Sequence, residues 1–177
     1  VAPPFPGPAG RPDLPAARSM YVCRASASDP TLAPAGCENL FMLVPTPADP
    51  AIGHGDAYGA AESPTVRAIA DAAVARLGAR LGVGDLAGRV VVRRTIGPAD
   101  FAGRYHAWRG SALGLAHTLG QSAFLRGRNV SDKLDELYYA GSTTLPGVGV
   151  PMCLISAENV LTRMRERGER GFGGRPE

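Results

Sequence analysis

The sequence lacks any apolar run near the length of about 20 residues that a membrane-spanning helix needs. It also lacks the ligand spacing of a metal site, because its three cysteines form no CxxC pair and its three histidines are scattered. These absences argue against a spanning helix and predict no bound metal. They leave three free thiols as the simplest interpretation of the cysteines.

No secretion signal is recognisable, because the sequence begins at Val1 rather than Met and has no charged segment leading into an apolar one. Such a start predicts a fragment or a processed chain, and we expect a cytoplasmic location. The formal net charge of +3 is only mildly basic. Since no nucleic-acid-reading module accompanies that charge, we expect no nucleic-acid partner.

Hydrophobic residues make up 45% of the 177 residues, which is enough for a core. This length fits one domain or parts of two. Proline crowds residues 1–19, where it fixes φ angles and removes backbone donors. We therefore expect a flexible or extended segment there. Glycine is frequent at the other end, and we expect residues 167–177 to form a flexible tail.

Periodicity and turn residues predict the elements between these ends. Short apolar runs at 20–25 and 39–45 suit an antiparallel pair of strands. Ser63 as a cap, Pro64 at the first helical position and Gly82 as terminator delimit an amphipathic helix. The other expected elements are a buried, β-branched strand at 89–96, a short helix at 99–108, a strand at 137–141 and a helix at 152–166.

The most informative stretch runs from Tyr138 to Pro151 and combines an expected strand, a glycine-rich loop and a helix start. Gly147 and Gly149 would let the backbone approach a ligand closely. A helix N-terminus has free N–H groups and a partial positive charge, which suit an anion or a polarised oxygen. An ordinary strand-to-helix turn explains the same residues, because a glycine-rich loop alone is a weak signal and no GxGxxG fingerprint is present.

This stretch resembles the C-terminal FAD-binding segment of the phytoene desaturase family, where a small residue and Gly lead into TxPGxGxP. Other stretches resemble the same family in the same order. They are Tyr21–Pro45 with its DPTLAPAGC centre, Thr95–Phe101, GSALG at 110–114, QSAFLR at 121–126, and Asn129. The resemblance runs from residue 20 to residue 165.

The resemblance implies FAD as cofactor, held by the loop. The implied cofactor-binding residues are Gly141, Ser142, Pro146, Gly147, Gly149, Val150 and Pro151. The chain departs from the family at Gly127, where Pro is frequent, and at Leu145, where His is frequent. Ser142 stands where wider relatives often carry an acid, although its hydroxyl can form a hydrogen bond. No catalytic acid or base is identified, since a flavin carries the chemistry itself.

The expected fold class is α/β, as the C-terminal portion of a two-domain flavoprotein. Residues 20–109 are expected to form part of a substrate-binding domain. Residues 110–166 are expected to be the returning strand–loop–helix of the FAD-binding domain. The family's N-terminal dinucleotide-binding unit is not among these residues, so we expect the chain to be inactive alone.

The implied reaction is the dehydrogenation of a C–C single bond in phytoene or a related carotenoid precursor. Because carotenes reside in lipid, we expect the enzyme to be associated peripherally with the membrane. Two alternatives stay open. The chain could belong to another flavin oxidoreductase of the amine oxidase-like group, or be a non-catalytic remnant that binds a partner chain.

Four other residues have both a functional and a structural interpretation. Trp108 could line a substrate tunnel, but we expect it in the core. Asp100 could act as a base, but its place after Gly97-Pro98 is typical of a helix start. Arg126 and Arg128 fit either a flavin phosphate or ribityl group, or surface salt bridges.

Overall fold

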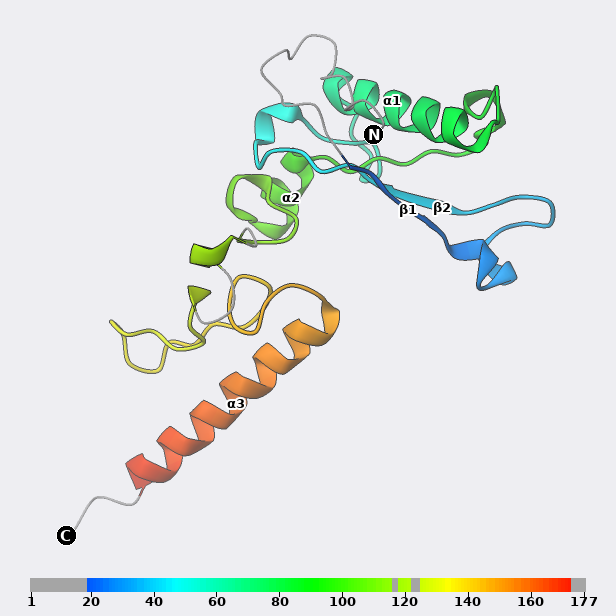
Figure 1. Cartoon of the computed structure of the whole chain (residues 1–177). Helices are drawn as coiled ribbons and strands as arrows, with labels where there is room; N and C mark the ends of the chain where they lie inside the picture. Colours follow the sequence, from blue (N-terminus) through cyan, green and yellow to red (C-terminus); the bar gives the residue numbers. More distant parts are fainter. Residues whose placement is uncertain (1–18, 116–117, 122–124, 173–177) are drawn as a thin grey trace. The chain divides into compact units, whose positions relative to one another are not determined.

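The computed structural model describes residues 19–115, 118–121 and 125–172 (Figure 1). The expectation of a flexible proline-rich start falls outside the described residues except at its last position. The same holds for part of the QSAFLR stretch, residues 122–124, and for the end of the expected tail, residues 173–177. The chain divides into two compact units, one ending at Ser111 and the other beginning at Ala112.

The first unit contains a two-stranded antiparallel sheet, as predicted from the two apolar runs. Strand β1 (Tyr21–Arg24) pairs with β2 (Leu40–Leu43), so that Tyr21 lies opposite Leu43 and Cys23 opposite Phe41. Opposite residues share a face, and Tyr21 and Phe41 meet edge-on at 6.3 Å between ring centroids. That face is wholly apolar, and its two aromatic rings are exposed.

Helix α1 (Pro64–Leu81) confirms the predicted amphipathic helix and both of its boundaries. Pro64 occupies the first turn, and Gly82 ends the helix with a left-handed φ of 67°. Ser63 stands at the N-cap, but its hydroxyl accepts a hydrogen bond from the backbone N–H of His54 at 3.0 Å instead of capping the helix. The helix buries Val66, Ala73 and Leu77.

The core of the first unit is small and lies where α1 meets a short turn. Ile52 and Val66 are buried against each other, with Ile69 partly buried beside them. Helix α2 (Pro98–Tyr105) packs against the 3-10 turn Pro50–Ile52 that carries Ile52. It is the short helix expected at 99–108, and it ends earlier, at His106, which takes a left-handed φ of 51°.

The expected buried strand at 89–96 is wrong. The segment forms no strand, and Val91 and Val92 are 87% and 74% exposed. β-branched residues favour extended backbone, but a strand also needs a neighbouring strand to bond with. Here the following residues are held by carboxylates instead, since Arg93 pairs with Glu62 and Asp71.

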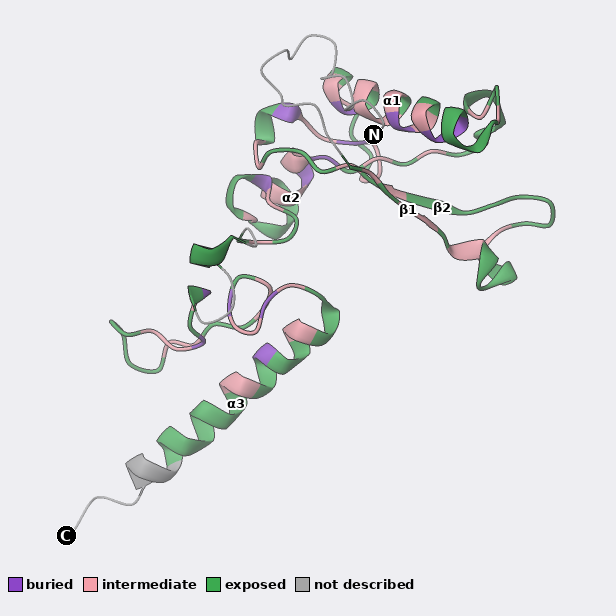
Figure 2. Cartoon of the chain, viewed as in Figure 1, coloured by how far each residue is buried: buried purple, intermediate pink, exposed green. Residues whose placement is uncertain are grey.

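The second unit is built from loops and one long helix, α3 (Val150–Phe172). The helix begins earlier than the expected Met152 and ends later than the expected Glu166. Figure 2 shows that its burial is confined to the N-terminal half, around Ser156. The side chains of the described residues beyond that half are largely exposed.

The expected strand at 137–141 is reduced to a single antiparallel bridge between Val130 and Tyr138. The cause is a side chain that interrupts the ladder. The backbone N–H of Tyr139 donates to the carbonyl of Asn129 at 2.9 Å, but the carbonyl of Tyr139 accepts from the Asn129 side-chain amide at 3.1 Å. A side-chain donor thus replaces a backbone donor.

The described residues therefore form a mixed structure of helices and a small sheet, which is compatible with the α/β class. The assignment of 20–109 and 110–166 to a substrate domain and an FAD domain stays a prediction. Within the described ranges, no helix has both the length and the apolar character required to cross a bilayer.

Candidate functional site

The loop from Gly141 to Gly149 leads directly into α3 and depends on glycine for its backbone shape. Gly141, Gly147 and Gly149 have φ values of 117°, 145° and 117°, a region that other residues rarely enter. A Cβ at Gly141 would meet nothing within 4 Å, and at Gly149 only Met152 Cγ at 4.0 Å. Backbone conformation, rather than lack of space, is therefore what requires glycine at these two positions.

A buried hydroxyl pair ties the start of this loop to α3. The Ser156 Oγ accepts from the backbone N–H of Gly141 at 3.1 Å and lies 2.9 Å from the Thr144 Oγ1. Thr144 donates its own proton to the carbonyl of Gly141 at 3.0 Å. Since a hydroxyl has one proton to donate, Ser156 must donate to Thr144. The backbone N–H of Gly141 is thus bonded by Ser156, and its carbonyl by Thr144.

Asn129, in the second unit, has no exposed surface. Its Nδ2 lies 3.0 Å from Ser156 Oγ, 3.1 Å from the carbonyls of Tyr139 and Leu145, and 3.3 Å from Thr144 Oγ1. Two N–H groups are shared among these four acceptors. Its Oδ1 is buried and has no partner among the described residues. An orphaned buried carbonyl is uncommon and marks a place where a further donor is expected.

Arg126 is buried against the loop. Its Nε donates to the carbonyl of Ser142 at 3.1 Å, and one terminal nitrogen donates to the same oxygen. Arg128, two residues on, forms an exposed ion pair with Asp132. The surface salt bridge, one of two interpretations of these arginines, is therefore confirmed for Arg128. Arg126 is instead buried beneath the glycine loop.

The seven residues expected to bind the cofactor differ in exposure along the loop. Gly147 is buried, while Gly141, Ser142 and Pro146 are half-buried. The three residues at the helix start, Gly149, Val150 and Pro151, are exposed. The free N–H groups of the first helical turn therefore lie beside an accessible, glycine-shaped backbone. Such an arrangement can contact a flat or anionic ligand through backbone atoms.

Three residues of this site were not singled out from the sequence: Asn129 as its hub, Thr144 and Ser156. Asn129 was noted only as part of a family-like stretch. A signal existed for Ser156, which is a small polar residue on the face of a helix start between Cys153 and Val160. Polar residues at such positions find partners in nearby loops, but the partner cannot be read from spacing alone.

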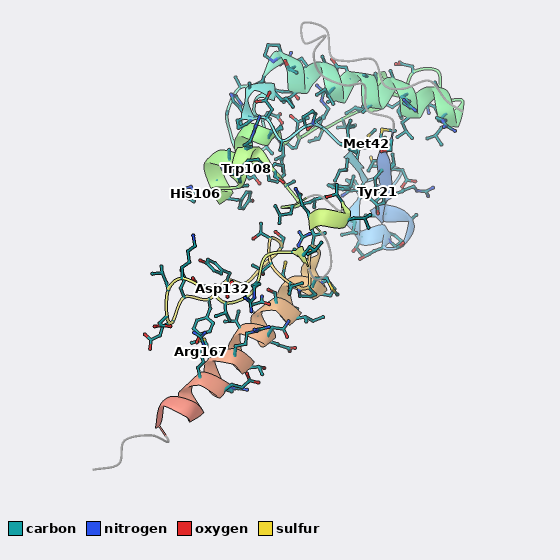
Figure 3. All side chains as sticks on the ribbon, turned by 60° about the vertical axis from the view of Figure 1, so that its left-hand side comes forward. Tyr21, Met42, His106, Trp108, Asp132 and Arg167 are labelled. Atoms are coloured by element: carbon teal, nitrogen blue, oxygen red, sulfur yellow. The ribbon has the colours of Figure 1, made fainter. Side chains whose placement is uncertain are left out.

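The other candidates fall in the first unit. Asp100 is buried and accepts from the backbone N–H groups of Gly55 at 2.7 Å and Gly97 at 2.8 Å, which confirms its role at a helix start. The expected core position of Trp108 is wrong. Trp108 is 75% exposed, with the Arg109 guanidinium 5.6 Å from its ring centroid, and Figure 3 shows it near His106. Trp108 lies in the short 3-10 turn Trp108–Gly110, in which Arg109 has a left-handed φ of 52°, rather than on a helix face that packs against the core.

A second polar cluster joins three separate segments of the first unit. The Asp56 carboxylate accepts from the backbone N–H of Thr95 at 2.8 Å and pairs with Arg94 at 3.2 Å. The Thr95 hydroxyl donates to Glu62 at 2.6 Å. The Thr95 N–H, followed by Arg94, lowers the pKa of Asp56 below its ordinary 3.8. All these carboxylates are occupied by structural partners.

Comparison with known proteins gives relatives along most of the chain. It is 44% identical over 156 residues to a carotenoid 3,4-desaturase of Haloarcula japonica. It is 35% identical over 153 residues to a 4,4'-diapophytoene desaturase (4,4'-diaponeurosporene-forming) of Staphylococcus aureus. These matches cover 88% and 86% of this chain. No protein-family model matches the chain.

The chain spans about 30% of the length of these curated relatives. These matches confirm the family resemblance found in the sequence: the chain is related to carotenoid desaturases, which are oxidoreductases.

Proposed function

We propose that this chain is the loop-bearing C-terminal part of an FAD-dependent carotenoid desaturase. The observation that carries the proposal is its homology to two carotenoid desaturases over most of its length, including the loop from Gly141 to Gly149. The proposed substrate is phytoene or a related carotene. The proposed reaction removes hydrogen across a C–C single bond and extends the conjugated system.

The residues of the loop fit an FAD cofactor. The glycine-shaped backbone is accessible at the start of α3, where partial positive charge suits the polarised oxygens of a flavin. The Ser142 hydroxyl forms no hydrogen bond with the described residues and can serve a ribityl oxygen. The buried, unpartnered Oδ1 of Asn129 lies in the network behind the loop. FAD would supply the hydride acceptor, and these residues would hold and orient it.

The chain's own residues would act by positioning rather than by acid–base chemistry. Asp132 is engaged by Arg128, and Asp100 by two backbone N–H groups. Loss of hydride to a flavin needs a fixed geometry more than a strong base. We therefore assign no catalytic acid or base.

The enzyme is further proposed to act at a membrane surface. A carotene is wholly apolar and is stored in lipid, so the active site must receive it from there. Exposed arginines of α3, Arg163 and Arg165, are candidates for contact with anionic headgroups.

The test uses the complete gene product that contains this sequence. The purified protein is checked for released FAD by absorbance and fluorescence, then mixed with phytoene in liposomes. We expect about one FAD per chain and a product whose absorbance moves to longer wavelength as conjugation grows. Diapophytoene, the substrate named for one relative, is assayed in parallel to define the chain length accepted.

Two outcomes would contradict the proposal. A well-folded protein that binds no flavin would remove its chemical basis. A flavin-loaded protein that leaves every carotene unchanged but releases hydrogen peroxide with amines would favour the amine oxidase-like alternative.

A further inference from the structure

The second unit contains a guanidinium group almost wholly removed from solvent. Arg126 is 2% exposed. Two of its nitrogens donate to a single oxygen, the carbonyl of Ser142. A guanidinium has five N–H donors, so this one acceptor leaves part of its hydrogen-bonding capacity unused. No other described residue forms a hydrogen bond with it.

The positive charge of Arg126 has no counter-charge among the described residues. No carboxylate of residues 19–115, 118–121 or 125–172 forms an ion pair with it, and the nearest arginine along the chain, Arg128, pairs with Asp132 at the surface. Burying a charge without a partner is costly, and proteins usually provide an anion for a buried arginine. The location of this charge therefore requires an explanation.

The guanidinium lies directly behind the glycine loop. A Cβ built on Gly147 would be 3.9 Å from the Arg126 Nε, and one built on Gly114 would be 3.5 Å from a terminal nitrogen. Its acceptor, Ser142, is also a loop residue. Arg126 thus bonds to one of the positions proposed to hold the cofactor, Ser142, and lies next to another, Gly147.

We propose that Arg126 is the charge that sets the reduction potential of the flavin held by this loop. The inference rests on the proposed function. In the reaction the carotene would lose a hydride to FAD and, from the adjacent carbon, a proton to water, so the bound cofactor gains one negative charge. A fixed positive charge in a poorly solvated interior favours that reduced form. The Ser142 carbonyl keeps the guanidinium in place.

The proposal separates the charge of Arg126 from its hydrogen bond. Arg126→Gln keeps an N–H donor for the Ser142 carbonyl and removes the charge. Arg126→Lys keeps the charge with a smaller donor set. Arg128→Gln removes a charge at similar distance along the chain, but from an exposed pair, and is the matched control.

The test measures the reduction potential of the complete flavoprotein against a reference dye. For Arg126→Gln, the equilibrium constant for two-electron reduction should fall about tenfold, equivalent to about 30 mV. Arg126→Lys should stay within about threefold of the parent protein, and Arg128→Gln should not differ. Variants purified without flavin are titrated with oxidised and with reduced FAD, because the ratio of the two dissociation constants gives the same quantity.

Equal shifts in the glutamine and lysine variants would show that Arg126 only shapes the loop, and would overturn the proposal. An unchanged potential in flavin-loaded Arg126→Gln would overturn it too, while leaving the FAD assignment intact. A parent protein without flavin would defeat the assignment itself, and this inference with it.

Discussion

At the scale of single residues, the glycines of the loop are needed for their backbone angles. Gly147→Val and Gly149→Val should lower the FAD content of the complete protein at least several-fold, because φ values of 145° and 117° are strained for any residue with a Cβ. The measurement is flavin absorbance per chain after gel filtration.

Gly36→Val is the matched control for this prediction. Gly36 has a φ of 77° and open space around it, and it lies in the first unit between β1 and β2. Its substitution also places a Cβ on a residue with positive φ and should leave the flavin content unchanged. Full occupancy in both loop variants would count against a loop that faces the cofactor.

Ser156 gives a second prediction at this scale. Ser156→Ala removes the acceptor of the Gly141 N–H and the donor to Thr144, both in a fully buried environment. The free energy of unfolding should fall by about 1–3 kcal/mol, the range for buried groups left unpaired. Urea denaturation of the complete protein measures it. Thr162→Ala, exposed on the same helix, should change it by less than about 0.5 kcal/mol.

Sequence reasoning located the loop glycines but not the residues that hold them. The glycines can be recognised in the sequence because glycine alone adopts positive φ angles readily, and because they recur at short spacing between an expected strand and a helix start. Asn129 and Ser156 are 27 positions apart and meet only once the chain has folded. Arg126 and Arg128 are the same residue type two positions apart. Only the structure shows that Arg126 is buried against the loop, whereas Arg128 forms a surface ion pair.

At the scale of elements, the segment after α1 is held by side chains rather than by a sheet, and this makes its stability depend on pH. The folded-state pKa of Asp56 is lowered, so its contribution is present above its unfolded pKa of 3.8 and is lost as pH falls through the lower folded value. At pH 6 the parent protein should therefore have a higher melting temperature than Asp56→Asn. Below pH 3.8 this difference in melting temperature should disappear.

Asp135→Asn serves as the control for that measurement, because Asp135 is exposed and forms no hydrogen bond or ion pair with the described residues. Its melting temperature should follow the parent protein across the whole pH range. A gap between the parent and Asp56→Asn that stays constant down to pH 2 would show that the carboxylate contributes nothing through its charge.

Elements with local stop signals were predicted well from the sequence, and elements that need distant partners were not. Helix α1 carries Pro64 and Gly82 at its ends, so its limits follow from local chemistry. Residues 89–96 have high β-propensity, yet a strand forms only against another strand. The strand expected at 137–141 failed because the Asn129 side chain took a backbone acceptor, which no propensity scale includes.

At the scale of the whole molecule, we expect this chain to supply only part of the proposed cofactor site. A dinucleotide is normally anchored by its pyrophosphate at a glycine-rich turn, and no GxGxxG occurs in this sequence. The 177-residue chain alone should therefore bind FAD weakly, with a dissociation constant above about 1 μM. Flavin fluorescence during titration measures it. Stoichiometric binding at submicromolar concentration would contradict this prediction.

Membrane docking belongs to the same scale. The complete protein should sediment with anionic liposomes at low salt, and less so at high salt, because exposed charges are screened. Replacing both Arg163 and Arg165 with Gln should weaken binding at low salt by about 1 kcal/mol for each charge. The control replaces Arg80 and Arg89, exposed arginines of the first unit, in the same way. Identical liposome binding of both double variants would show that the arginines of α3 do not contribute to membrane contact.

The division between Ser111 and Ala112 has a consequence for how such chains can be recombined. The hydrogen bonds of Asp56 and Asp100 lie within the first unit, and those of Asn129 and Ser156 lie within the second. A chimera joined at this position would therefore inherit both hydrogen-bond networks unbroken. Exchange of residues up to Ser111 between related desaturases would therefore keep the residues of each described network from one parent.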